Sequence, residues 1–185
     1  MILFQQIIPK ENIMIWKTTL SLLFLLPSFF ALSAQNIKAY EITEYLAQNS
    51  NKKTSVSTMK TKSSAQAAVP LQVLAYDLVP TVFIESNEIN AYDEKSPIKA
   101  EVDFKSFSKL LKANSLFEKV ELLVIKFDDA ASLPSTIDFS KISGFSSLKY
   151  IYIICPFNCS NTEIEKIAME LPSGVVLLYS TSIPQ

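Results

Sequence analysis

Three short runs of β-branched, aliphatic and aromatic residues in the second half of the chain most constrain its fold. They cover residues 120–127 (VELLVIKF), 148–155 (LKYIYIIC) and 175–180 (VVLLYS). Each run has the length of a β-strand and is apolar almost throughout rather than at alternate positions. Strands with this pattern are covered on both faces, as in a parallel sheet. A further strand is expected within residues 71–76, within 81–85, or in both.

Helical patterns separate these runs. Ser160 and Glu163 form a capping-box pattern that predicts the start of a helix, and Pro172 predicts its end. Apolar residues recur at helical spacing between them: Ile164, Ile167, Ala168 and Leu171. A similar stripe predicts a helix ahead of residue 120: Phe104, Phe107, Leu110 and Leu111. Because such helices connect parallel strands as crossovers, the sheet is expected to be mainly parallel.

The strand regions also repeat at a spacing of 28 residues. The superposition matches four pairs: Phe117 with Phe145, Val120 with Leu148, Leu122 with Tyr150, and Val124 with Tyr152. A second repeated phrase, an apolar residue followed by Asp and Phe, stands at 102–104 and at 137–139. The repetition favours a stack of similar β/α units.

Residues 145–154 (FSSLKYIYII) resemble the strand portion of a leucine-rich repeat, and the resemblance extends over about residues 102–180. Cys155 stands where this family has an asparagine or cysteine after the strand. The resemblance implies a curved solenoid whose strand face binds other proteins. A small α/β sandwich explains the same periodicity, so the expected class is α/β with a mainly parallel sheet, in either form.

Residues 1–34 carry the features of a secretory signal peptide. A lysine precedes a short apolar core at 20–32, and small residues follow it. We expect cleavage after Ala34, with cleavage after Ser33 as the alternative, and Met14 is an alternative start of translation. The core is shorter than the ~20 apolar residues of a membrane span, so no stable span is expected after cleavage. The protein is therefore predicted to be exported, into a periplasm or out of the cell.

Charge divides the rest of the chain. Residues 35–68 hold five lysines and two glutamates, whereas 69–185 hold ten lysines and fifteen acidic residues. Residues 48–64 are almost wholly polar and bury too little apolar surface to offset their ordering entropy. We expect a flexible basic segment over 35–68 and an α/β globular domain over 69–185.

The basic segment has two features of its own. Four of its lysines fit a solvated linker or, alternatively, a patch for anionic surfaces: Lys52, Lys53, Lys60 and Lys62. Near its start, four apolar side chains also allow a short helix or strand that docks on the domain: Ile37, Tyr40, Tyr45 and Leu46.

Composition excludes several chemistries. The chain has no histidine, and all 17 basic residues are lysines, which removes Ser/His/Asp and Cys/His nucleophile systems, histidine-ligated zinc and an arginine finger. Its two glycines stand thirty residues apart, so no phosphate-binding loop or dinucleotide fingerprint can be formed. A net charge of −1 disfavours nucleic-acid binding. We therefore assign no catalytic, cofactor-binding or metal-binding residue and expect no cofactor.

Two sets of residues remain as candidates for a chemical role. Cys155 and Cys159 stand between a strand and a capped helix, where a structural disulfide is the first expectation. Buried free thiols, or a redox or metal-binding pair, are the alternatives. Asp77, Asp128 and Asp129 are predicted near the carboxyl ends of strands, where they would suit Ca²⁺ or Mg²⁺, unless they only begin solvated loops.

Tyr150 and Tyr152 alternate with isoleucines, so both rings are expected on one face of a strand. That face either packs in the core or, together with Asp128 and Asp129, forms an interaction surface. The predicted function is that of an exported, non-enzymatic module that binds another protein or a cell-surface component. The alternative is a small redox or metal-dependent enzyme built on the two cysteines and the strand-end aspartates.

Overall fold

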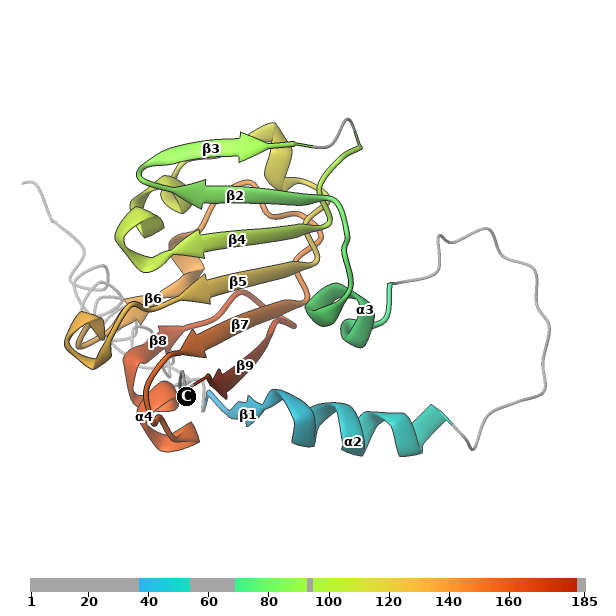
Figure 1. Ribbon diagram of the computed structural model, residues 1–185, viewed down its shortest axis with the longest axis vertical. Helices are drawn as coiled ribbons and strands as arrows, with labels where there is room; N and C mark the ends of the chain where they lie inside the picture. The colour runs from blue at the N-terminus through green and yellow to red at the C-terminus, as the bar shows by residue number, and fades with distance from the viewer. Residues whose placement is uncertain (1–36, 54–68, 93–94, 183–185) are drawn as a thin grey trace, which may run out of the picture. The chain divides into compact units, whose positions relative to one another are not determined.

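The computed structural model describes residues 37–53, 69–92 and 95–182, with no side-chain detail for 50–53 (Figure 1). The predicted signal peptide and most of the polar stretch before residue 69 lie outside the described residues. The described residues belong to one unit that begins at Asn36. None of its described helices has the length and hydrophobicity of a membrane span.

A seven-stranded sheet forms the centre of this unit, in the order β1-β9-β7-β5-β4-β2-β3. Every neighbouring pair is parallel except the hairpin of β2 and β3, which confirms the mainly parallel α/β prediction. The strands are β1 (Ala39–Glu41), β2 (Thr81–Glu85), β3 (Glu88–Ala91), β4 (Lys99–Asp103), β5 (Leu122–Lys126), β7 (Tyr150–Cys155) and β9 (Val176–Thr181). The three apolar runs therefore become β5, β7 and β9.

The start of the predicted flexible segment takes part in the sheet. β1 pairs with β9, and α2 (Ile42–Lys53) follows it directly. Ile37 is buried in the core on one face of the sheet, and Ile42 is buried in the core on the other, where Leu46 also packs, so this part docks as a short strand and helix. The globular unit thus begins well before residue 69.

Residues 71–76 form the short helix α3 (Leu71–Tyr76) rather than a strand. A short apolar run is compatible with either structure, and Pro70 suits the residue before the first helical turn. Residues 81–85 do form a strand, as expected.

The crossovers are shorter and more irregular than predicted. The stripe after residue 103 forms the 3-10 helix η2 (Phe104–Leu111) instead of an α-helix. The remaining crossover elements are η3 (Ser115–Phe117), η4 (Ala130–Ser132), β6 (Ile137–Asp138), η5 (Phe139–Lys141), α4 (Asn161–Ile167) and β8 (Ala168–Glu170). β6 and β8 form a second, two-stranded sheet.

The capping box of α4 is confirmed. Glu163 Oε2 accepts a hydrogen bond from the Ser160 backbone N–H at 2.8 Å, and the Ser160 hydroxyl accepts one from the Glu163 N–H at 3.4 Å. The helix ends at Ile167, four residues earlier than the apolar stripe predicts. It ends there because the next three residues pair with β6 as a strand.

The 28-residue repeat gives the register of the two central strands. Leu122 pairs with Tyr150, and Val124 pairs with Tyr152, as superposed in the sequence. The repeated Asp-Phe phrase marks a recurring junction, since Asp103 and Asp138 each stand at the N-cap position of a 3-10 helix that begins at the following phenylalanine, although only Asp138 accepts a capping hydrogen bond.

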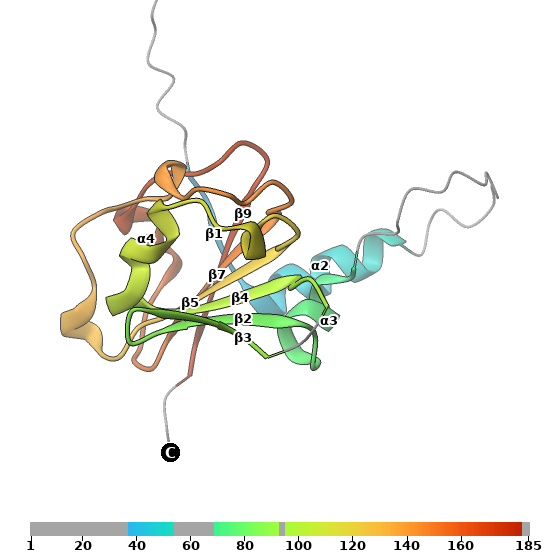
Figure 2. The ribbon, with the colours of Figure 1, turned by 90° about the horizontal axis from the view of Figure 1, so that it is seen from above.

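Each face of the sheet has its own core. The crossovers pack on one face, the crossover face, which carries Leu123, Ile125, Ile151 and Ile153. α2 and α3 pack on the other, the helix face, which carries Leu122, Val124, Tyr152 and Leu178. Figure 2 shows both helices on one side of the strands.

Helical cover on the helix face is uneven. The strand residues that pack with α2 and α3 come from β5, β7 and β9. A row of paired residues crosses this face from β7 to β2: Tyr152, Val124, Glu101 and Phe83. The row is apolar under the helices and becomes charged at β4. On this face no described helix covers β2, β3 and β4, since η2 packs on the crossover face (Figure 1). This open part of the sheet and the cleft beside the helices are where ligands can reach the fold.

Candidate functional site

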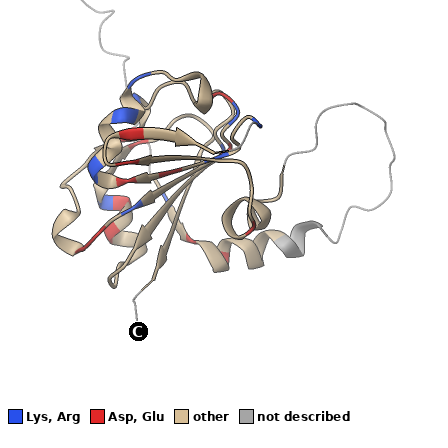
Figure 3. Ribbon diagram, turned by 45° about the horizontal axis from the view of Figure 1, so that its top comes forward, with Lys and Arg blue, Asp and Glu red and all other residues tan. Residues whose placement is uncertain are grey.

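A cavity of about 800 Å³ lies between α2, α3 and β7. Tyr45, Tyr76 and Tyr150 each contribute a ring to it, one from each element. We call it the tyrosine cavity. Its described lining is Thr43, Tyr45, Leu46, Ala47, Asn49, Pro70, Leu71, Gln72, Tyr76 and Tyr150, with no lysine, aspartate or glutamate among them. α3 itself carries no charged residue (Figure 3).

Three tyrosine rings form a chain of contacts from Tyr40 through Tyr45 to Tyr150. Tyr45 meets Tyr150 edge to face, with ring centroids 6.4 Å apart at 74°, and Tyr40 lies 5.5 Å from Tyr45. Burial, and then the neighbouring phenols, raise the pKa of Tyr45 above 10.0. Burial followed by the charge of Glu121 raises the pKa of Tyr150 in the same direction. These phenols are therefore neutral at physiological pH and offer hydrogen bonds without charge.

The two tyrosines singled out in the sequence share the helix face but differ in exposure. Tyr152 is buried, and its hydroxyl lies 2.7 Å from the Ser180 hydroxyl on β9. Tyr150 is half-buried and lines the tyrosine cavity. Tyr152 therefore serves the core, whereas Tyr150 is placed to meet a ligand. Sequence periodicity put both rings on one face but did not indicate where α2 and α3 leave a gap.

The aspartates do not converge. Asp128 lies beyond the carboxyl end of β5 and pairs with Lys105 at 2.6 Å. Asp129 caps η4, accepting a hydrogen bond from the Ser132 N–H at 2.8 Å. Asp77 follows α3 and precedes β2, so it lies toward the amino ends of the parallel strands and not at the predicted edge.

The aspartates were candidates for a metal site and for an interaction surface shared with the tyrosines, and their separation supports neither. Within the described residues no cluster of three or more metal-ligating side chains occurs. Tyr150 begins β7, whereas Asp128 follows the far end of the neighbouring parallel strand. Asp128 and Asp129 are thus at the opposite end of the sheet from the tyrosine cavity, whereas Asp77 directly follows Tyr76 of that cavity.

Cys155 and Cys159 are free thiols, which matches the alternative of buried free thiols and not the expected disulfide. Both are buried in the core of the crossover face. Burial, and then the side-chain interaction with Cys159, raise the pKa of Cys155. Cys159 Sγ also lies 3.6 Å from the Thr181 hydroxyl. A buried thiol of this kind is protonated and is a poor nucleophile.

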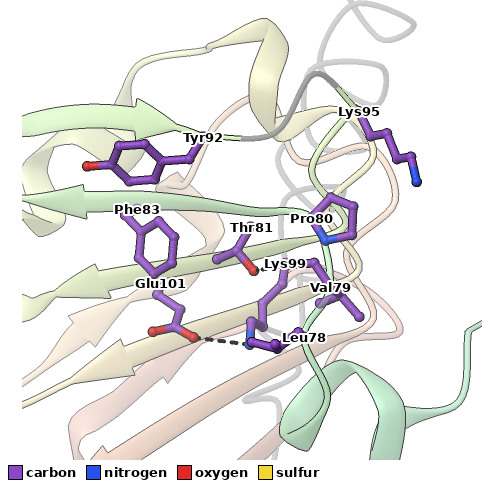
Figure 4. Close-up of a pocket in the computed structure, with 9 residues that line it drawn as sticks. All are labelled: Leu78, Val79, Pro80, Thr81, Phe83, Tyr92, Lys95, Lys99 and Glu101. Carbon is purple, nitrogen blue, oxygen red and sulfur yellow. Dashed lines mark hydrogen bonds and ion pairs between the residues drawn. The ribbon is translucent and has the colours of Figure 1, made fainter.

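A second cavity, of about 620 Å³, opens over the uncovered strands (Figure 4). We call it the open-sheet cavity. Phe83 and Tyr92 form an aromatic wall with centroids 5.9 Å apart, and Lys99 pairs with Glu101 at 3.1 Å at its base. Lys126 pairs with the other oxygen of Glu101. The described lining is Leu78, Val79, Pro80, Thr81, Phe83, Tyr92, Lys95, Lys99 and Glu101.

The sequence analysis missed this cavity, although a signal for it was present. Lys99 and Glu101 alternate with the buried Ala100 and Val102, so one face of β4 is charged within a parallel sheet. Such a pattern is unusual for a strand covered on both faces.

The fold defines an α/β protein with a mainly parallel sheet. Comparison with protein-family models, with curated proteins and with solved structures finds no match to this chain.

Proposed function

We propose that this is an exported, non-enzymatic binding module that holds a segment of another protein, or of a cell-surface component, in the tyrosine cavity. The observation that carries the proposal is the convergence of tyrosine rings from α2, α3 and β7 on one uncharged cavity. Three tyrosines line this cavity, Tyr40 contacts Tyr45, and Tyr152 packs in the same core, so five of the seven tyrosines of the chain gather at or next to it: Tyr40, Tyr45, Tyr76, Tyr150 and Tyr152.

Tyrosine suits a binding surface for physical reasons. Its ring buries a large area while few rotatable bonds are fixed, and its hydroxyl tolerates water when no partner is present. Tyr76 is 54% exposed, so part of this aromatic surface is accessible in the free protein. The uncharged lining favours a partner segment that is apolar or polar but not charged.

The leucine-rich-repeat-like form of the fold stays part of the proposal. Three consecutive parallel neighbours, β5, β7 and β9, are joined by crossovers that pack on the same face, as in a solenoid. In such a protein the opposite strand face binds partners, and here that face carries the tyrosine cavity. The alternative form, a small sandwich, is supported by α2 and α3 on the helix face.

The competing enzyme hypothesis draws less support from the sites. A redox role needs an accessible thiol with a lowered pKa, whereas Cys155 is buried and its pKa is raised. A metal-dependent role needs converging carboxylates, whereas Asp128 and Asp129 make local structural contacts.

Site-specific photo-cross-linking in the source cells tests the proposed function. A photoreactive phenylalanine analogue replaces Tyr76 at the cavity, and the control carries the same group at Met169, which is 63% exposed on β8. We expect one discrete cross-linked species from position 76, lost when Tyr45→Ser is added to a protein that still folds. The same species from both positions, or a species unaffected by Tyr45→Ser, would overturn the proposal.

A further inference from the structure

We infer that the open-sheet cavity is a binding site for a small organic carboxylate with an apolar body. This site is separate from the tyrosine cavity and goes beyond the proposed function. It combines a buried positive charge with an aromatic wall, and the two parts fit the two ends of such a ligand.

The positive charge comes from a triad in which Lys99 and Glu101 line the cavity and Lys126 pairs with Glu101. Lys99 and Lys126 each pair with one oxygen of the Glu101 carboxylate. Burial alone would raise the pKa of Glu101, but hydrogen bonds and charges from Lys126 and Lys99 outweigh it and lower that pKa. Glu101 is therefore ionised at neutral pH, and the triad carries two positive charges and one negative charge.

Burial makes the excess charge significant. Lys99 is only 9% exposed and Glu101 has a side-chain exposure of 17%, so this pair is largely withdrawn from water, whereas the side chain of Lys126 is 39% exposed. A charge in such a place is costly unless it is balanced by a partner. A ligand carboxylate beside the two lysines would bring the group to two positive and two negative charges. The domain as a whole is acidic, so this local positive charge is not part of a general basic surface.

The apolar part of the site lies directly above the triad. Phe83 pairs with Glu101 across β2 and β4, and its ring contacts that of Tyr92. Leu78 and Tyr92 are the two most exposed large apolar residues of the described chain, at 106% and 81%. Both belong to this one cavity, where an apolar ligand body would cover them.

The size of the cavity indicates a small molecule. A volume of about 620 Å³ falls within the range of ligand pockets, roughly 300–1,000 Å³. Figure 4 shows Phe83 and Tyr92 standing beside the Lys99–Glu101 pair, so one compact ligand can reach both. An aryl-substituted or alkyl-substituted carboxylic acid meets these requirements.

An NMR titration of the isotope-labelled full chain with a small carboxylate tests the inference. The probe is 3-phenylpropanoate, and its uncharged match is 3-phenylpropanamide. We expect the acid to shift the amide resonances of Phe83, Tyr92 and Lys99 and to bind about tenfold or more tightly than the amide. Equal affinity for the two probes, or acid-induced shifts confined to Tyr76 and Tyr150, would overturn the inference.

Substitutions distinguish the contribution of charge to ligand binding from that of apolar contact. Lys99→Gln is expected to weaken binding of the acid about tenfold or more without changing that of the amide. Tyr92→Ala is expected to weaken both probes, and because this side chain is exposed, the variant remains informative even if Lys99→Gln fails to fold. Lys105→Gln, at an exposed lysine elsewhere, is the matched control. Unchanged affinity in folded Lys99→Gln and in Tyr92→Ala would contradict the assignment. These outcomes are independent of cross-linking at Tyr76, so failure of one proposal leaves the other standing.

Discussion

The Glu165 carboxylate on α4 accepts a hydrogen bond from the backbone N–H of Ala39 on β1, at 3.1 Å. The two residues are 126 positions apart in the chain. The contact links the first described strand to the last α-helix and helps to hold β1 at the edge of the sheet beside β9. Since α2 follows β1 directly, the same contact helps to position one wall of the tyrosine cavity.

Glu165→Ala is therefore expected to loosen β1 and α2. Loss of one partly buried hydrogen bond should lower the free energy of unfolding by about 1 kcal/mol. Hydrogen exchange should accelerate at Ala39, Tyr40 and Glu41 while the protection of β5 and β7 is retained. Glu118→Ala, at an exposed glutamate after η3, is the control. Uniform acceleration across the sheet would contradict a local role for Glu165.

Local patterns were enough to predict the centre of the fold. The apolar runs give β5, β7 and β9, and the repeat gives the pairing of Leu122 with Tyr150. The capping box gives the start of α4. These features depend on side chains close together in the sequence, or on a repeat that the sequence displays directly.

The remaining features depend on tertiary contacts. Leu71–Tyr76 is too short for its periodicity to distinguish helix from strand, and the helix face beneath it decides the outcome. β1, β6 and β8 have two or three residues each, so pairing partners define them and not intrinsic preference. The open-sheet cavity exists because α2 and α3 cover β5, β7 and β9 and leave β4 accessible, which no local pattern specifies.

The only two glycines of the chain both adopt positive φ, and this allows a matched comparison. Gly144 has φ of 89° and Gly174 has φ of 79°. A Cβ at position 144 would lie 3.1 Å from the Asn114 backbone nitrogen, whereas nothing lies within 4 Å at position 174. Gly174→Ala should lower the free energy of unfolding by about 1 kcal/mol, because alanine must then adopt the left-handed conformation. Gly144→Ala should cost at least about 1 kcal/mol more because the backbone of Asn114 must move. Chemical denaturation measures both, and equal losses would contradict the close approach at Gly144.

Glu101 gives the protein a predictable response to acid. The lysine partners hold its pKa below the ordinary 4.5, so the folded state binds this proton less readily than the unfolded chain. The resulting stabilisation is complete above pH 4.5 and is lost as the pH falls through the lowered pKa. Glu101→Gln should lower the free energy of unfolding by roughly 1–3 kcal/mol at pH 7, because Lys99 loses its partner. The difference from wild type should shrink below pH 4.5. A difference that is constant from pH 7 to pH 3 would show that the ion pairs are not its cause.

The predicted signal peptide lies outside the described residues and is tested by the exported protein itself. Cleavage after Ala34 leaves Gln35 as the first residue and removes Trp16, the only tryptophan. Intact-mass analysis of the exported protein should give a chain that begins at Gln35, with tyrosine but no tryptophan fluorescence. Leu25→Lys, which places a charge in the apolar core, should block export. An exported protein that retains Trp16 would contradict cleavage at this place.

The two thiols should be inert in the folded protein. Both are buried, and Cys155 holds its proton more tightly than a free thiol because its pKa is raised. Iodoacetamide at pH 8 should therefore label neither cysteine in the native protein and both after unfolding without reductant. Mass spectrometry distinguishes this outcome from a disulfide, which would give an unfolded chain that takes up no label and is lighter by two hydrogens.

The same thiol predicts a loss of stability in alkali. Because the pKa of Cys155 is higher in the folded state than its ordinary value of 9.0, its stabilising contribution is complete below that pH and declines as the pH rises above it. The free energy of unfolding of wild type, relative to Cys155→Ala, should therefore fall between pH 8 and pH 10. Cys159→Ala in the same titration shows how much of the effect requires the second thiol. A wild-type advantage that stays constant across this range would mean that Cys155 ionises as readily in the folded protein as in the unfolded chain.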